Sequence, residues 1–104
     1  MTPAARAQAA IDLLDAVIEA ARSGGAAADT IAQRFFAARR YAGSKDRRAI
    51  RGLVYEAIRS FGERPVSGRA AMVALARSRP ELAECFDGST YGPGPIRPDE
   101  PQAE

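Results

Sequence analysis

The sequence predicts an all-α protein, a compact bundle of four or five helices followed by a disordered Pro-rich tail. Hydrophobic residues make up 46% of the 104 residues, and much of this share is alanine, which favours helix. The residues that favour strands, Val, Ile and Thr, are sparse. No stretch alternates polar and apolar residues for long. We expect one domain over residues 1–87 and a linker or tail over 88–104.

The first predicted helix begins at Pro3 and ends at the Gly24-Gly25 pair. Thr2 is a typical N-cap, and proline is favoured at the first helical position. Glycine ends a helix because it adopts left-handed backbone without steric cost. The inner stripe is spaced by three and four residues: Ala7, Ile11, Leu14, Ile18 and Ala21. The opposite face is mainly acidic, which predicts a solvated face, and comprises Gln8, Asp12, Asp15 and Glu19.

The second and third predicted helices are separated by a break at Gly43. The second runs from about Ala26 or Asp29 to about Arg39 or Arg40, with Ile31, Phe35 and Ala38 facing inward. Ser44 can cap the third helix. That helix carries a full core-facing stripe of Ile50, Leu53, Val54, Ala57, Ile58 and Phe61. We expect Leu14, Ile18, Phe35, Ile50, Leu53, Val54, Ile58 and Leu75 to share one core.

The remaining helices are shorter. A fourth starts near Ser67, with Ala71, Met72, Leu75 and Ala76 inside. The "SRPE" sequence at residues 78–81 has the capping-box pattern and predicts a fifth helix through Leu82 and Phe86, ending at Gly88. Four of the seven prolines follow, with few apolar residues. Such a segment buries too little surface to offset its ordering entropy, so we expect a disordered linker.

The residues that usually carry catalysis are scarce. The chain has no histidine and one cysteine, so the common general base and the usual zinc patterns are excluded. Cys85 lies between Glu84 and Asp87, whose charges raise a thiol pKa. We therefore expect no catalytic residue, metal or cofactor in this chain. There is no signal peptide or membrane-spanning run, and we expect a cytoplasmic protein.

Positive charge is concentrated in the body of the chain. Residues 1–79 hold 14 Lys and Arg against 7 Asp and Glu, whereas residues 80–104 hold one Arg against six acids. Between Arg34 and Arg51 there are seven cationic residues and one aspartate. This asymmetry favours a polyanionic partner. The alternative is that the arginines reflect genome composition and form only a solvated face.

On the third helix the cations form a stripe with an aromatic ring among them. At 100° per residue, Arg48, Arg51, Tyr55 and Arg59 lie about 135° from the apolar stripe. Guanidinium groups suit phosphate oxygens, and Tyr55 could stack on a base. Arg47 falls near the edge of the apolar face, where Asp12, Asp15 or Asp46 could pair with it. The predicted RNA-binding residues are Arg39, Arg40, Lys45, Arg48, Arg51, Tyr55 and Arg59.

The segment "KDRRAIRGLVYEAIRSFG" resembles the Asp-Arg…Leu-Val-Tyr…Arg segment in the NusB-like domain of bacterial RNA cytosine-5 methyltransferases. Asp46 and Arg47 match the Asp-Arg pair, and the rest of the motif matches at Leu53, Val54, Tyr55 and Arg59. The opening "TPAARAQAAIDLLDAVI" is similar to the first helix of that domain. The resemblance covers roughly residues 3–87.

The resemblance implies a NusB-like helical bundle that helps bind ribosomal RNA, ahead of an S-adenosylmethionine domain. The catalytic cysteines of the family lie in that second domain, and no position here matches them. The leading hypothesis is a non-catalytic, RNA-binding domain from the N-terminus of an rRNA methyltransferase. Two alternatives stay open: a helical protein-interaction module whose stripe meets an acidic protein surface, as in NusB-like antitermination factors, and a spacer that packs on a catalytic domain.

Overall fold

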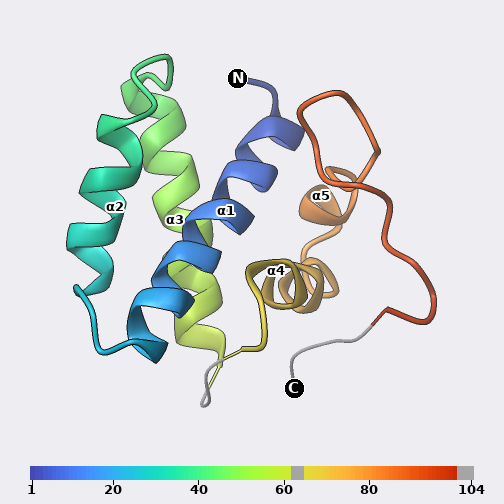
Figure 1. Cartoon of the computed structure of the whole chain (residues 1–104). Coiled ribbons are helices and arrows are strands. Elements are labelled where there is room, and N and C mark those ends of the chain that lie inside the picture. Colours follow the sequence, from blue (N-terminus) through green and yellow to red (C-terminus); the bar gives the residue numbers. More distant parts are fainter. Residues whose placement is uncertain (62–64, 101–104) are drawn as a thin grey trace.

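The computed structural model describes residues 1–61 and 65–100 (Figure 1). Within these residues the chain is all-α, as predicted, with no strand and five helices. They are α1 (Pro3–Arg22), α2 (Ala28–Ala37), α3 (Ser44–Ser60), α4 (Gly68–Ala76) and α5 (Pro80–Ala83). None of the described helices is both long and apolar enough to cross a membrane.

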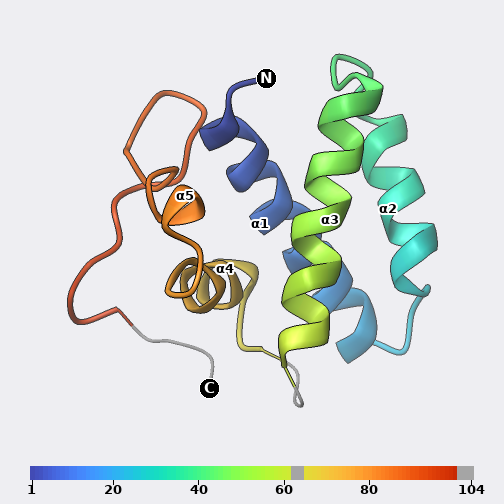
Figure 2. The same cartoon turned by 180° about the vertical axis from the view of Figure 1, so that it is seen from behind.

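Helix α1 is the centre of the fold. In Figures 1 and 2, α2 and α3 lie on one side of it, and α4 and α5 lie on the other. Its contacts with α2, α3 and α4 explain why α1 buries more than one stripe. Its buried residues are Ala4, Ala7, Ala9, Ala10, Ile11, Leu13, Leu14 and Ile18. The alanines among them allow neighbouring helices to approach closely.

The predicted N-cap at Thr2 is confirmed, and the fourth helix begins next to Ser67 as expected, with the Ser67 side chain as its cap. The Thr2 hydroxyl accepts a hydrogen bond from the Ala5 N–H (3.0 Å), and the Ser67 hydroxyl accepts one from the Ala70 N–H (3.0 Å). Each satisfies an N–H group that has no partner within its helix. Gly24 has a φ of +69°, as expected for a glycine that ends a helix.

The other two predicted caps are wrong. Gly43, not Ser44, is the N-cap of α3, and the Asp46 carboxylate accepts the Gly43 N–H (3.4 Å). Ser78 lies in the turn after α4 and donates its hydroxyl to the Leu75 carbonyl (3.2 Å). The N-cap of α5 is therefore Arg79, without a side-chain cap, and α5 ends well before Gly88.

Most of the predicted core is buried in one cluster: Leu14, Ile18, Phe35, Ile50, Val54 and Leu75. Leu53 is only partly buried, although it packs against this cluster. The prediction is wrong for Ile58, which is 37% exposed, and for Ala21 and Ala38, which are exposed. Ile58 lies at the edge of the apolar stripe of α3, about 80° from Ile50.

The acidic face of α1 also anchors α4. The Gly68 N–H, at the start of α4, donates to Asp15 Oδ1 (2.6 Å). The two backbones are so close that a Cβ on Gly68 would lie 2.3 Å from the Ile11 carbonyl oxygen. Only glycine fits this crossing, and one member of the predicted solvent face, Asp15, therefore has a structural role.

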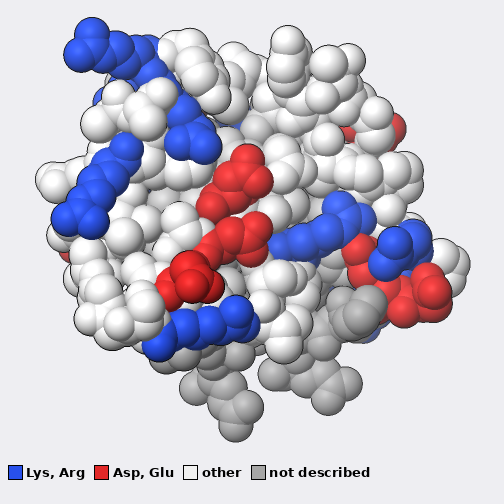
Figure 3. All heavy atoms as spheres, in the orientation of Figure 1, with Lys and Arg blue, Asp and Glu red and all other residues white. Residues whose placement is uncertain are grey.

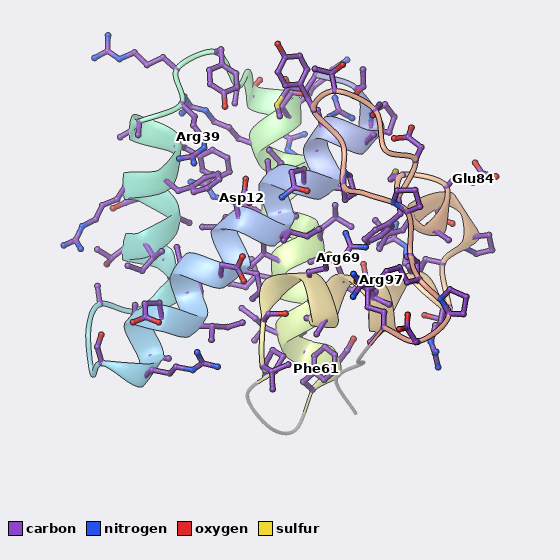
Figure 4. All side chains as sticks on the ribbon, turned by 45° about the vertical axis from the view of Figure 1, so that its right-hand side comes forward. Asp12, Arg39, Phe61, Arg69, Glu84 and Arg97 are labelled. Atoms are coloured by element: carbon purple, nitrogen blue, oxygen red, sulfur yellow. The ribbon has the colours of Figure 1, made fainter. Side chains whose placement is uncertain are left out.

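Residues 88–100 contain no helix or strand, as expected for the tail, but they lie against the body of the domain. Pro93 is fully buried, and its carbonyl accepts the Gly88 N–H (3.0 Å). Arg69 of α4 holds the segment: Nη2 donates to the carbonyls of Gly94 (3.0 Å) and Pro95 (3.1 Å). The guanidinium of one α4 side chain, labelled in Figure 4, thus supplies hydrogen-bond partners for two carbonyls of this segment.

We expect acid to release this segment. Arg69 Nε pairs with Glu100 (2.5 Å), and this hydrogen bond is the main reason why the pKa of Glu100 lies below its usual value. A lowered carboxyl pKa stabilises the folded contact above the ordinary pKa, and the contribution is lost as pH falls through the lowered one. Amide exchange in residues 88–100, corrected for its intrinsic pH dependence, should therefore rise on acidification.

Amide exchange at neutral pH tests the role of Arg69 without the effects that acid has on other groups. Arg69→Ala should raise exchange in residues 88–100 while leaving α1 protected. Arg97→Ala is the matched control, because Arg97 is exposed and pairs only loosely with Asp99 (3.8 Å). Unchanged exchange in Arg69→Ala would show that Arg69 does not hold the segment.

Candidate nucleic-acid interface

The structure divides the seven predicted RNA-binding residues into groups. Arg39 and Arg40 lie in the loop after α2, and Lys45 and Arg48 lie in the first turns of α3. These four come from consecutive elements at one end of the α2–α3 pair (Figure 2). Arg59 belongs to the last turn of α3, about 16 Å along the helix axis from Arg48. The predicted stripe is therefore longer than one compact site.

Three of the four clustered cations are free to meet a partner. Arg40, Lys45 and Arg48 are exposed, and no acidic group of the described residues forms a salt bridge with them. The nearest acid in sequence, Asp46, pairs instead with Arg6 of α1 (2.7 Å). That hydrogen bond is the main reason why the pKa of Asp46 is lowered. We call Arg40, Lys45 and Arg48 the basic end.

The charged surface around α1 has both signs. Figure 3 shows basic side chains over α2 and the loop that follows it, at the upper left, and a red band across α1 in the centre. The exposed acids of α1 are Asp12, Asp15 and Glu19. A polyanion would be repelled by this band, so its backbone is expected to stay over the basic end.

Arg39 is held against the protein. Its guanidinium lies 3.6 Å from the centre of the Phe35 ring, and Nη1 donates to the Phe35 carbonyl (3.3 Å). It is half-buried. These contacts leave Arg39, a predicted RNA-binding residue, less free to reach a partner than the exposed cations. Its positive charge still adds to the electrostatic field of the basic end.

Two further arginines lie over the Phe36 ring. The guanidinium of Arg51 lies 4.9 Å from the centre of the Phe36 ring, and that of Arg47 lies 5.7 Å from it. The expectation that Arg47 pairs with an acid is wrong: its Nε donates to the Ala42 carbonyl (2.8 Å) and its Nη2 to the Phe36 carbonyl (3.5 Å). Phe36 belongs to the last turn of α2 and Ala42 to the loop before α3, so Arg47 of α3 ties the end of α2 and this loop to its own helix.

Tyr55 is tied to the start of α2. Its hydroxyl donates to the Asp29 carboxylate, and this hydrogen bond is the main cause of its raised pKa. The ring is partly buried. Its position beside Arg51 and Arg59 on α3 is as predicted, but its phenol already joins two helices, so it is less available for stacking than an exposed ring.

Arg59 lies in a separate groove of about 970 Å³ between the start of α1, α3 and α5. The charges of this groove are mixed, because Arg79 pairs with Glu56 (2.5 Å) and Glu81 (2.6 Å). Leu53 and Leu82 add apolar surface. The groove therefore has no excess of positive charge to attract a polyanion.

Cys85 also lines this groove. The thiol is buried and donates to the Glu81 carbonyl (3.4 Å). Burial is the main cause of its raised pKa, and Asp87 and Glu84 add to the effect, as the sequence predicts for these acids. A raised pKa keeps the sulfur as the unreactive thiol. In the described part of the chain, no cluster of acidic, cysteine or histidine side chains could hold a metal ion.

A second groove, of about 890 Å³, was not anticipated from the sequence. It lies beside the basic end and is lined by the first half of α1, by Arg39 and Tyr41, and by Thr90 to Gly92. Tyr41 and Tyr91 are 74% and 77% exposed. The only sequence signal for Tyr41 is its place within the cationic run, and Tyr91 gives none, because it is distant in sequence.

Comparison of the chain with protein-family models, with curated proteins and with solved structures found no match.

Proposed function

We propose that this chain is a non-catalytic RNA-binding domain that contacts the RNA backbone through the basic end. The observation that carries the proposal is the exposure of Arg40, Lys45 and Arg48 without acidic partners among the described residues. Unpaired cations grouped at one end are the electrostatic footprint of a polyanion site. The resemblance of residues 3–87 to NusB-like domains supports ribosomal RNA as the partner, and an adjoining methyltransferase domain as the source of catalysis.

A protein-interaction module is the second candidate. The observation that favours it is the groove between α1, α3 and α5, which combines apolar Leu53 and Leu82 with charges of both signs. Protein interfaces typically combine an apolar centre with a polar rim. The two candidates use different surfaces, so variants at the basic end test the RNA-binding proposal without disturbing this groove.

The test is an RNA titration across a series of salt concentrations. Each phosphate contact releases counterions, so each of Arg40→Ala, Lys45→Ala and Arg48→Ala should flatten the log–log slope by about 0.7 for a single strand. Arg59→Ala is the control, because it is an exposed cation of α3 outside the basic end and should change the slope less. If the triple variant binds like the parent at every salt concentration, the basic end is only a solvated face.

A further inference from the structure

The groove beside the basic end has walls from three distant parts of the chain. Its floor belongs to α1 and includes Ala5, Ala9 and Asp12. One wall carries Arg39 and Tyr41, and the other consists of residues 90–92. The volume of about 890 Å³ lies within the range of pockets that hold small molecules. Small alanines on the floor leave room for a flat group.

The two tyrosines of this groove are unusually exposed. They are the most exposed of the large apolar side chains among residues 1–61 and 65–100. Neither phenol takes part in a hydrogen bond within these residues, unlike Tyr55, which donates to Asp29. An exposed aromatic face beside cations is the combination that binds an unstacked base, because stacking tolerates any base and cations hold the backbone.

The charges of the groove determine which part of a nucleic acid enters. Asp12 lies in the groove, and its Oδ1 accepts a hydrogen bond from Gln8 Nε2 (2.9 Å). Its carboxylate repels a phosphate, but it accepts hydrogen bonds from N–H groups. Figure 4 shows Asp12 on α1 and Arg39 at the end of α2, on the same side of the molecule. The base is thus favoured inside, and the phosphates are favoured over the basic end.

We propose that this groove holds one unstacked base of a single-stranded RNA, stacked on Tyr41 or Tyr91 with its edge toward Asp12. The inference rests on the proposed RNA-binding function and adds the site at which a base is read. Guanine suits the site best, because its N1–H and N2–H groups are adjacent donors for one carboxylate, whereas uracil offers a single donor flanked by carbonyls.

Three short strands of equal length test the proposal: oligouridine with one central guanosine, oligouridine, and a base-free ribose-phosphate chain. The Tyr41→Ala/Tyr91→Ala variant should bind the guanosine strand about 5- to 150-fold more weakly than the parent. Binding of the base-free chain should be unchanged. The Tyr41→Phe/Tyr91→Phe variant keeps both rings and should bind like the parent. Asp12→Ala should remove the preference for the guanosine strand over oligouridine.

Tyrosine fluorescence gives a direct readout, because the chain has no tryptophan and three tyrosines. In a Tyr55→Phe background, the guanosine strand should quench the emission of the two groove tyrosines, and the base-free chain should not. This signal reports stacking itself and is independent of the measured affinity.

The outcomes separate the groove from the basic end. Binding of the guanosine strand by the double Ala variant at the parent's affinity, with steep salt dependence intact, would overturn the base site and leave the RNA-binding function standing. An equal loss of affinity for the base-free chain would also overturn it, because the tyrosines would then act without a base. If the parent binds none of the strands, the proposed function fails and the base site fails with it.

Discussion

Replacing Gly68 with alanine should lower the free energy of unfolding by about 1–3 kcal/mol or more. The new Cβ would lie 2.3 Å from the Ile11 carbonyl oxygen and 3.1 Å from the Asp15 nitrogen, both backbone atoms of α1 that cannot move alone. Helix α4 would have to withdraw from α1. That movement would also break the hydrogen bond from the Gly68 N–H to Asp15 Oδ1 (2.6 Å).

Gly52→Ala is the matched control for this substitution. Gly52 lies in the middle of α3 and is exposed, and a Cβ placed there meets no atom within 4 Å. Alanine should therefore stabilise the helix by about 0.5–1 kcal/mol. If the crossing of α1 and α4 is as described, urea denaturation should show a lower free energy of unfolding for Gly68→Ala and a higher one for Gly52→Ala. Two changes of the same sign would contradict that crossing.

Local features were predictable from the sequence because their causes are local. The N-caps at Thr2 and Ser67 depend on a side chain and an N–H three residues later, and the core stripe of α3 depends on spacing alone. The acidic face of α1 was predicted as solvated, whereas the partner of Asp15 lies 53 residues away in sequence. No periodicity in a single sequence reveals such a contact.

The candidate site was predicted in part for the same reason. Charge clustering along the chain identified Arg40, Lys45 and Arg48, and the structure leaves them exposed. Helical spacing put Tyr55 among the arginines, but it could not show that Asp29 of α2 engages the phenol. Tyr41 and Tyr91 line one groove only because residues 90–92 return to α1.

The contacts of Arg69 with residues 94–100 could not be predicted from composition. A segment rich in proline has little apolar surface to bury, so its composition predicts disorder. The carbonyls of Gly94 and Pro95 nevertheless accept hydrogen bonds from Arg69 of α4. The same segment also buries one apolar side chain, Pro93, completely.

Phe36→Ala should have the largest effect on stability, a loss of about 3–5 kcal/mol. The Phe36 side chain is 1% exposed, and its ring forms a T-shaped pair with the Phe35 ring, with centroids 5.4 Å apart. Truncation would leave a cavity between α2 and the core. It would also remove the aromatic face beneath the guanidinium groups of Arg47 and Arg51.

Phe36→Leu separates buried volume from the aromatic contacts. Leucine keeps most of the apolar volume, so the loss should be smaller, about 1–2 kcal/mol, from imperfect packing and two weakened cation–π contacts. Urea denaturation of the two variants measures the difference. If both variants lost the same free energy of unfolding, buried volume would not be the main contribution of Phe36 to stability.

The Phe36→Leu variant also tests whether the core affects the proposed RNA-binding surface. Arg47 lies over the Phe36 ring and donates to the Ala42 carbonyl (2.8 Å), at the end of the loop that carries Arg40 and Tyr41. With Arg47 less well held, that loop should be less ordered. Phe36→Leu, measured where it is still folded, should therefore bind RNA more weakly than the parent while keeping its salt slope, because the cations proposed to bind phosphate are all retained. A flattened slope would instead show that the substitution displaces a cation that binds phosphate, either Arg40 in the loop or Arg47 or Arg51 over the Phe36 ring.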